Sequence, residues 1–304
     1  MDILPDLKNI TVDPWNHAHF QKNELEVEVL RLDKIHPDIS GNKWFKLKYF
    51  IESARKLNKQ KLISFGGAHS NHLLALAAAS GIYGFSSVGY VRGEKPRQLS
   101  YMLRAATTYG MELHFLSRPE YDQKKKLATE HPESENEPDS LLIPEGGAGL
   151  DGIKGAEEIL SQMSLTRYSH FCCAVGTGTT LTGLVNNTKD DQKIIGVSVL
   201  KGTHGFEPLN ILMIKKPESL KNVQMIHTDH FGGYAKKNKL LIDFMNQIFD
   251  ESGIPTDFVY TGKLFYSISR MASENAFPNG SRILILHSGG LRGNHSLAPG
   301  LLQF

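Results

Sequence analysis

Lys43 stands in a sequence context that suits covalent chemistry, at the end of the segment SGNK (residues 40–43). An amine becomes a nucleophile when burial or a nearby positive charge lowers its pKa, and it then forms a Schiff base with a carbonyl group. Lys46 lies three residues further on, close enough on one helical face to lower that pKa or to bind the same anion. Such a lysine is otherwise a solvated surface residue, so this segment alone leaves both interpretations open.

A second polar segment, GGAHSNH (residues 66–72), follows the apolar run LISF. Glycine permits a tight turn, and the backbone N–H groups at a following helix start attract anions. Ser70 and Asn71 add side-chain hydrogen bonds, so a substrate carboxylate would fit here. The alternative is an ordinary strand-to-helix turn in which Ser70 or Asn71 only caps the helix.

A third segment lies between the apolar run FCCAV and a predicted helix, and it consists of Gly176, Thr177, Gly178, Thr179 and Thr180. Small residues at a helix start expose N–H groups, and the threonine hydroxyls add donors, which together can hold a phosphate. The segment lacks the Gly-Lys-Ser/Thr ending of a P-loop and the spacing of a dinucleotide fingerprint. A structural glycine turn is the remaining alternative.

Two late segments, YTGK (residues 260–263) and HSGG (residues 287–290), each follow a run that is strand-like. A hydroxyl such as that of Ser288 can hydrogen-bond a pyridine nitrogen without keeping it protonated, whereas a carboxylate would hold the proton there. Taken alone, each segment is more often a turn than a site. No zinc-type, EF-hand or nucleophile-elbow motif occurs, so we expect no metal.

The elements that must position these residues alternate between strands and helices, which predicts an α/β fold with parallel sheets covered by helices. Continuous apolarity of the strands indicates burial on both faces. The predicted strands are 62–65, 87–91, 113–116, 141–144, 171–175, 194–200 and 282–287. The predicted helices are 44–57, 71–80, 98–110, 152–163, 180–187 and 240–250, with a charged surface helix and loop over 119–140.

The composition excludes several classes of protein. The 304 residues carry 34 basic and 32 acidic side chains, a balance unlike that of a dedicated nucleic-acid or membrane-surface binder. The only cysteines are adjacent, Cys172 and Cys173, and cannot staple distant segments, which suits a reducing compartment. The N-terminus lacks a secretory signal and no apolar stretch reads as a membrane span, so we expect a soluble, cytoplasmic protein.

Six segments together resemble the 1-aminocyclopropane-1-carboxylate deaminase and D-cysteine desulfhydrase family: SGNKWFKLKY, SFGGAHSNHLLALAAA, AVGTGTTLTGL, GGYAK, VYTGK and LHSGG. The resemblance implies a pyridoxal 5'-phosphate enzyme of fold type II, in the tryptophan synthase β-like group. It implies two open twisted parallel-sheet domains with helices on both faces and an active site in the cleft between them. The expected large domain comprises residues 1–46 and 151–304 and the small domain residues 47–150, in a homodimer.

The resemblance also implies roles for individual residues. Lys43 is similar to the Schiff-base lysine, which also carries the proton, while Ser70, Asn71 and His72 match the segment that holds the substrate carboxylate. Tyr234 and Tyr260 match the two active-site tyrosines. The residues expected to bind the cofactor are Lys43, Lys46, Asn71, Val175, Gly176, Thr177, Gly178, Thr179, Thr180, Tyr260, Thr261 and Ser288; Ser70, Tyr234 and Tyr260 are expected to assist Lys43 in catalysis.

Two positions bear on the reaction. Cyclopropane-opening members of the family carry Glu after the VY tyrosine and Leu after the late histidine, whereas this chain has Thr261 and Ser288. Hydroxyl residues there are similar to the desulfhydrase branch, which predicts β-elimination from D-cysteine or a related amino acid to pyruvate, ammonia and hydrosulfide. The alternatives are 1-aminocyclopropane-1-carboxylate deaminase, a D-serine-type dehydratase, and a catalytically silent small-ligand binding protein on the same fold.

Overall fold

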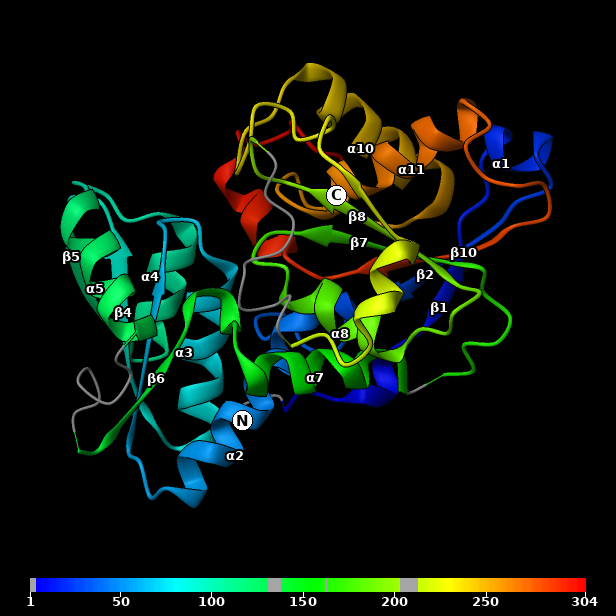
Figure 1. The fold of residues 1–304 in the computed structure, drawn as a ribbon. Helices are drawn as coiled ribbons and strands as arrows, with labels where there is room; N and C mark the ends of the chain where they lie inside the picture. Colours follow the sequence, from blue (N-terminus) through cyan, green and yellow to red (C-terminus); the bar gives the residue numbers. More distant parts are fainter. Residues whose placement is uncertain (1–3, 131–137, 162, 203–212) are drawn as a thin grey trace.

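The computed structural model describes residues 4–130, 138–161, 163–202 and 213–304, and its strands form two β-sheets (Figure 1). The larger sheet has the strand order β1-β2-β10-β7-β8-β9 and the smaller sheet has the order β5-β4-β3-β6. Among the described strands, every pairing is parallel except that of β1 with β2 at one edge, which is antiparallel. The predicted α/β class is confirmed, with a mixed rather than purely parallel larger sheet.

The strands are β1 (Val12–Pro14), β2 (Glu26–Arg31), β3 (Lys61–Gly66), β4 (Ser86–Arg92), β5 (Glu112–Leu116), β6 (Ser140–Ile143), β7 (His170–Val175), β8 (Lys193–Ser198), β9 (Val223–Ile226) and β10 (Arg282–His287). The α-helices are α1 (Ala18–Lys22), α2 (Asn42–Lys56), α3 (Asn71–Tyr83), α4 (Tyr101–Thr108), α5 (Arg118–Glu130), α7 (Leu150–Ser161), α8 (Thr179–Asn187), α10 (Lys239–Ser252) and α11 (Thr261–Ser273). Short 3-10 helices include η3 (Glu145–Gly147) and η5 (Leu291–Ser296).

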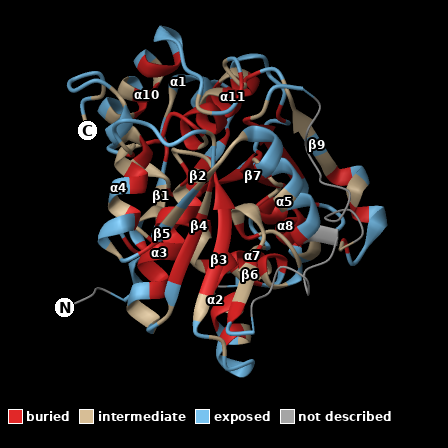
Figure 2. Cartoon of the chain, turned by 90° about the vertical axis from the view of Figure 1, so that its left-hand side faces the viewer, coloured by how far each residue is buried: buried red, intermediate tan, exposed pale blue. Residues whose placement is uncertain are grey.

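Burial on both faces explains why β7 is apolar from Phe171 to Val175. All six residues of β7 are buried, and successive side chains enter different cores: Cys172 packs with Val29 and Phe265, whereas Cys173 packs with Phe45 and the helices α7 and α8. Figure 2 shows β3 and β7 almost wholly buried, and β2 and β4 buried over most of their length. The two cysteines are free, and they point to opposite faces of the sheet.

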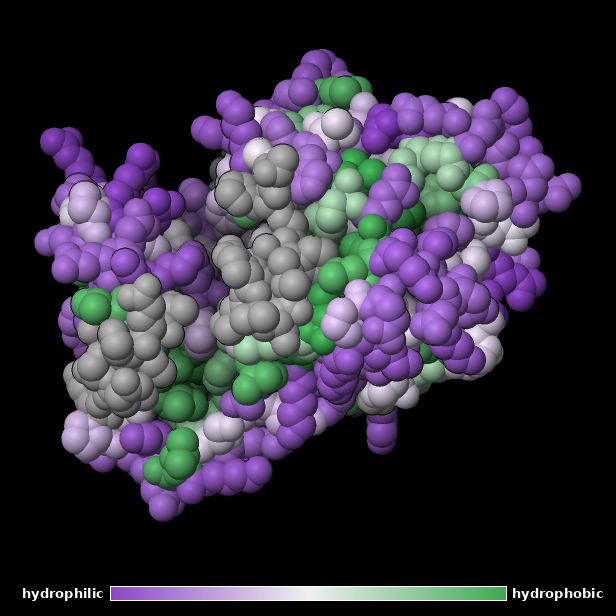
Figure 3. Space-filling view, viewed as in Figure 1, coloured by the Kyte–Doolittle hydropathy of each residue, from purple (hydrophilic) through white to green (hydrophobic). Residues whose placement is uncertain are grey.

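Helices cover both faces of each sheet, as predicted. On the larger sheet, α10 and α11 lie on one face and α7 and α8 on the other (Figure 1). On the smaller sheet, α2, α3 and α4 share one core while α5 packs on the opposite face. The exterior seen in Figure 3 is largely hydrophilic, with hydrophobic residues gathered along the middle of that face.

Helix α2 belongs to both cores. Phe45 packs in the core of the larger sheet, whereas Leu47, Phe50 and Ile51 pack in that of the smaller sheet. The first turn of α2 packs directly on the backbone of α7. A Cβ on Gly155 of α7 would lie 1.7 Å from the carbonyl oxygen of Phe45, so the close approach depends on this glycine. The division into domains at residue 46 stays a prediction, which this change of core supports.

Gly41 joins the start of α2 to the end of β10. Its φ of 67° and ψ of −140° suit glycine alone, and a Cβ there would lie 1.9 Å from the carbonyl oxygen of Ser288. The backbone N–H of Asn42 also donates to that oxygen, at 3.4 Å. A side chain at residue 41 would therefore separate the two segments that carry Lys43 and Ser288.

The structure corrects several predicted elements. Helix α2 begins at Asn42 rather than at Trp44, so Lys43 lies inside its first turn. The run before Tyr260, expected to be strand-like, contains no strand and ends in a turn over residues 258–260, which leads into α11, a helix not predicted. The strands β1, β2 and β9 and the helix α1 were also not predicted. The charged stretch 119–140 contains most of α5 as expected, while residues 131–137 lie outside the described part of the chain.

We expect Gly41→Ala to lower the free energy of unfolding by about 3 kcal/mol or more, because strain at a positive φ and a backbone clash act together. Gly84→Ala is the matched control, since Gly84 has φ 80° but a Cβ added there would meet no atom within 4 Å. It should cost about 1 kcal/mol from conformation alone. Denaturant unfolding measures both, and equal losses would show that the contact with Ser288 contributes nothing.

Candidate active site

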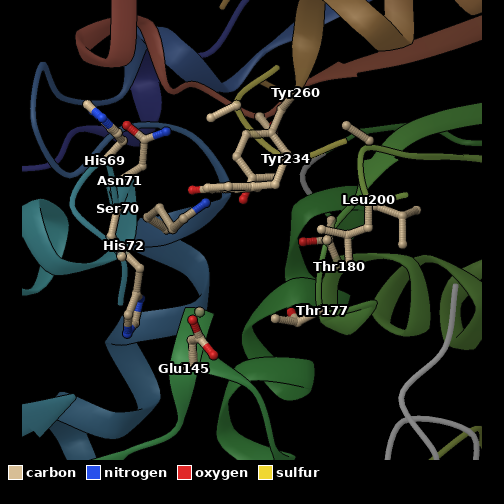
Figure 4. Close-up of a pocket in the computed structure, with 18 of the residues that line it drawn as sticks. His69, Ser70, Asn71, His72, Glu145, Thr177, Thr180, Leu200, Tyr234 and Tyr260 are labelled. Atoms are coloured by element: carbon tan, nitrogen blue, oxygen red, sulfur yellow. The ribbon is translucent and has the colours of Figure 1, made fainter. Parts of the chain in front are cut away.

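A cavity of about 740 Å³ lies where the carboxyl ends of strands from both sheets meet. Ligands of open α/β sheets bind at such strand ends. The predicted site residues that line it are Lys43, Lys46, Ser70, Asn71, His72, Val175, Gly176, Thr177, Gly178, Thr180, Tyr234, Tyr260 and Ser288. Residues more than 240 positions apart in the sequence thus share one cavity, as Figure 4 shows for part of the set.

Lys43 lies at one end of a short hydrogen-bonded chain. Its Nζ donates to Asn42 Oδ1 at 2.9 Å, and Asn42 Nδ2 donates to Thr180 Oγ1 at 2.8 Å. Nζ also lies 5.6 Å from the centroid of the Tyr260 ring. Burial lowers the pKa of Lys43 to about 8, and the charge of Asp257 opposes the shift. The amine is therefore far more readily deprotonated than an exposed lysine.

Lys46 lies one turn further along α2 and is also buried. Its Nζ donates to the carbonyl oxygen of Gly146 at 3.2 Å. Burial and the charge of Lys43 hold its pKa well below the ordinary value. Two cations in one cavity repel each other, so an anionic ligand bound between them would be favoured.

The start of α8 offers unused donors to the cavity. Its N-cap, Gly178, has φ 84° and provides no side-chain hydrogen bond to the helix. The first N–H groups of a helix have no intrahelical acceptor, so those of Thr179, Thr180 and Leu181 remain available for an anion. Thr180 Oγ1 accepts from Asn42, which leaves its own proton free to donate as well. This is a cradle that fits a phosphate group.

Ser70 caps α3 and still has a proton to offer. Its Oγ accepts from the backbone N–H of Leu73 at 3.2 Å, so the hydroxyl hydrogen is not used by that bond. The backbone N–H groups of Asn71 and His72, at the first helical positions, have no intrahelical acceptor. Together these donors make a second anion site, opposite the start of α8 in Figure 4.

The His72 imidazole is neutral and carries its proton on Nε2. Ser64 Oγ donates to the carbonyl oxygen of Ile143 at 2.7 Å, so its contact of 2.9 Å with His72 Nε2 assigns the proton to Nε2. Burial, together with Lys43 and Lys46, lowers the pKa of His72 to about 3, which keeps the ring neutral. Its buried Nδ1 is then an acceptor, with no partner among the described residues. An acceptor nitrogen cannot bind a carboxylate, so the contact predicted for His72 could come only from its backbone N–H.

Tyr234 and Tyr260 come from different segments and lie beside each other at the cavity wall (Figure 4). Their ring centroids are 6.0 Å apart with the planes 75° apart, and the two hydroxyls share a hydrogen bond. Tyr260 lies against the backbone of Gly176, where a Cβ would be 3.4 Å from its ring. Burial raises the pKa of Tyr260 well above its ordinary value, so the phenol stays protonated and can donate.

The side chains of two predicted cofactor residues do not line the cavity. Thr261 is fully buried, and its Oγ1 donates to Asp257 Oδ1 at 2.8 Å while accepting from the backbone N–H of Asp257 at 2.7 Å. Thr179 is buried with its hydroxyl 3.0 Å from that of Thr177. Thr261 thus serves the local fold of the α11 start, and the late segments line the cavity with Tyr260 and Ser288.

Two carboxylates of this region have no counterpart in the sequence prediction. Glu145 lines the cavity, and it accepts from Tyr121 OH at 3.0 Å and from Lys125 Nζ at 2.6 Å. It lies just after β6, so the position of ligand sites at strand ends could have identified it. Asp257 lies behind Tyr260 without lining the cavity, and no sequence motif marks it.

Within the described ranges, no three His, Cys, Asp or Glu side chains gather as metal ligands would. No described helix is long and apolar enough to cross a membrane.

Comparisons with known proteins fit this geometry. A family model described as pyridoxal-phosphate dependent enzyme matches residues 10–289. A Pyrococcus abyssi protein named, provisionally, a 1-aminocyclopropane-1-carboxylate deaminase is 27% identical, over 96% of this chain and 94% of its own. The bifunctional D-cysteine desulfhydrase/1-aminocyclopropane-1-carboxylate deaminase of Arabidopsis thaliana is 26% identical, over 89% and 74%. A solved structure of an ACC deaminase homologue shares the fold, with a TM-score of 0.77 at 23% identity over 96% and 93% of the two chains.

We expect cofactor-free protein to capture pyridoxal phosphate on Lys43 with a pH midpoint near 8, because only the unprotonated amine attacks a carbonyl. Capture should be slow below that pH and rise through it, instead of rising near 10.5 as for an exposed lysine. Borohydride reduction across a pH series, followed by peptide mapping, measures this. Lys43→Ala should remain unlabelled, and label on Lys46 or Lys263 in the native chain would contradict the assignment.

We expect Gly178→Val to weaken binding of pyridoxal phosphate at least about tenfold, since the branched side chain opposes φ 84° and crowds the N–H groups of the α8 start. Gly110→Val is the matched control: Gly110 also has φ 84°, with no atom within 4 Å of a Cβ, and it does not line the cavity. Equilibrium titration should give native affinity for the control. Unchanged affinity in Gly178→Val would place the phosphate elsewhere.

Proposed function

Because the chain belongs to the pyridoxal-phosphate dependent enzyme family, we propose that it is a lyase that eliminates hydrosulfide from D-cysteine, after which water hydrolyses the remaining enamine to pyruvate and ammonia. Family membership gives the cofactor, pyridoxal 5'-phosphate, and the small amino-acid class of substrate. The substrate itself is inferred from the residues that surround the cavity, together with relatives named for D-cysteine desulfhydrase and 1-aminocyclopropane-1-carboxylate deaminase.

The cavity residues fit the cofactor. The uncapped start of α8, with the Thr180 hydroxyl and Lys46, would hold the phosphate, and Lys43 is the amine for its carbonyl carbon. Ser288 would meet the ring nitrogen, and Asn71 would lie beside the ring. When bound, the cofactor supplies an electron sink that makes the hydrogen on the substrate Cα acidic.

The remaining steps fall to side chains of the chain itself. The Ser70 hydroxyl and the N–H groups of the α3 start hold the substrate carboxylate, which fixes the direction of the Cα–H bond. Lys43 Nζ takes the Cα proton, a task that its pKa of about 8 suits. Tyr260, protonated and paired with Tyr234, can donate a proton to the departing sulfur.

One observation carries the choice of reaction: the side chain from the end of β10 that lines the cavity is Ser288, not a carboxylate. A hydroxyl leaves a pyridine nitrogen unprotonated, which makes a moderate electron sink. Elimination after Cα deprotonation needs no more than that, whereas opening a cyclopropane that has no Cα hydrogen needs a stronger one. Thr261, the other position expected to indicate the reaction, does not support this choice because its hydroxyl is bound to Asp257 and does not meet the cavity.

The lining carboxylate that the structure does show comes from the other sheet. Glu145 follows β6, and its carboxylate accepts hydrogen bonds from Tyr121 and Lys125.

A silent binding protein would not need a buried amine of lowered pKa beside a protonated tyrosine pair, so the site favours catalysis. A cytoplasmic location and a homodimer remain part of the proposal.

We expect D-cysteine and β-chloro-D-alanine to be turned over at least about a hundredfold faster, in kcat/KM, than 1-aminocyclopropane-1-carboxylate, a difference of roughly 2.7 kcal/mol in barrier. L-cysteine and D-serine complete the panel, with pyruvate, 2-oxobutanoate and ammonia as measured products. Lys43→Ala is the blank for cofactor chemistry in solution. Preference for the cyclopropane substrate would establish the deaminase, preference for D-serine the dehydratase, and no turnover of any substrate the binding protein.

A further inference from the structure

Asp257 is a fully buried carboxylate whose oxygens are both engaged by the start of α11. Oδ2 accepts from the backbone N–H groups of Val259 at 2.9 Å and Tyr260 at 3.0 Å. Oδ1 accepts from the N–H and the hydroxyl of Thr261, both at 2.8 Å. Buried charge of this kind is retained only when it is well compensated, and these donors compensate it.

The hydrogen bonds fix Tyr260 from behind. Tyr260 is the residue immediately before α11, and its backbone N–H is tied to Asp257 while its ring projects into the cavity against Gly176 (Figure 4). A change at Asp257 would release the backbone at the very residue that carries the phenol. In the native chain the start of α11 cannot bind an anion from the cavity, because its N–H donors are already bound to Asp257.

The same turn of α11 also holds Tyr234, through Lys263. Lys263 is fully buried, and its Nζ donates to the carbonyl oxygen of Gly233 at 2.7 Å, one residue before Tyr234. Burial lowers the pKa of Lys263 to about 8, and the charge of Asp257 opposes this. Asp257 is thus the negative charge that compensates Lys263, and Lys263 in turn holds the residue before Tyr234 by a hydrogen bond.

Asp257 lies directly behind the wall of the cavity. A Cβ on Gly290 would be 3.2 Å from Asp257 Cγ and 3.1 Å from Asn71 Nδ2, so only one glycine separates the carboxylate from a site residue. Its charge acts on Lys43 from α2, Lys263 from α11 and the phenols of Tyr234 and Tyr260. The other carboxylate that acts on the two phenols is Glu145, from η3.

We propose that Asp257 is a positioning residue of this site, which holds Tyr260 and Tyr234 toward the cavity and provides the buried negative charge behind Lys43. The proposal rests on the proposed roles of Lys43 and the tyrosines. The competing interpretation is that Asp257 does no more than cap a helix, in which case its loss would lower stability and leave the site unchanged.

The test compares Asp257→Asn with Asp229→Asn. Asp229 is a buried carboxylate bound to the same helix, through Ser267 Oγ at 2.8 Å and Arg270 Nη2 at 3.0 Å, and it does not line the cavity. Both variants should lose stability in denaturant unfolding. Only Asp257→Asn should shift the titration of Lys43 in cofactor-free protein to lower pH, by roughly half a unit or more. Carbon-13 NMR of Cε-labelled lysine measures it, with the signal assigned by its loss in Lys43→Ala.

Turnover gives the second readout. Asp257→Asn should lower kcat at least about tenfold, while Asp229→Asn stays within about twofold of the native chain. Asp257→Glu keeps the charge but lengthens the side chain, so it should restore the native Lys43 titration and still lower kcat through a displaced Tyr260. This variant also serves if Asp257→Asn does not fold.

A native Lys43 titration in Asp257→Asn, an equal shift in Asp229→Asn, or a shift that persists in Asp257→Glu would each overturn the proposal. The titration is made without cofactor or substrate. Failure of the proposed reaction would therefore appear as absent turnover in the native chain, with the Lys43 titration still able to decide the role of Asp257.

Discussion

Contact between the Gly41 backbone and the Ser288 carbonyl brings together segments from near the two ends of the chain, and the site depends on it. From that contact α2 runs out of one core and into the other, because Phe45 belongs to the larger sheet and Leu47 to the smaller. Close packing of Gly155 on Phe45 fixes the helix against α7. The position of Lys43 relative to the α8 start is therefore set by backbone contacts, which do not depend on side-chain rotamers.

The cavity concentrates positive charge and hydrogen-bond donors. Lys43 and Lys46 lie on one helical face, the starts of α3 and α8 present free N–H groups, and His72 is kept neutral beside them. Such an arrangement is costly when the protein is alone, because buried cations lose hydration. It becomes favourable once anions occupy both helix starts, as a phosphate and a carboxylate would. Preorganised donors of this kind need little rearrangement when the ligand arrives.

Much of this could be predicted from the sequence, and the exceptions have physical causes. Long apolar strands and amphipathic helices identified the α/β class, and the glycine- and hydroxyl-rich strand ends identified most of the cavity residues. The short edge strands β1 and β9 carry weak periodic signals because edge strands bury less. Thr261 was expected to bind the cofactor, but its hydroxyl is bound to Asp257, four residues earlier, and no sequence pattern indicates that bond. Asp257 itself lies in no motif, and its importance depends on which buried cations surround it.

The strand order of the larger sheet has a consequence for how the chain folds during synthesis. β10 lies between β2 and β7, and of the described strands it is the last to be synthesised. The smaller sheet uses strands from residues 61–143 alone, so its pairings are local and can form first. β2 must wait for some 250 residues of further chain before its partner β10 exists, so this side of the β1–β2 pair stays unpaired in the meantime. We therefore expect chaperone dependence to concentrate on the β1–β2 pair, and truncations that remove β10 to leave β2 and β7 without the strand that joins them.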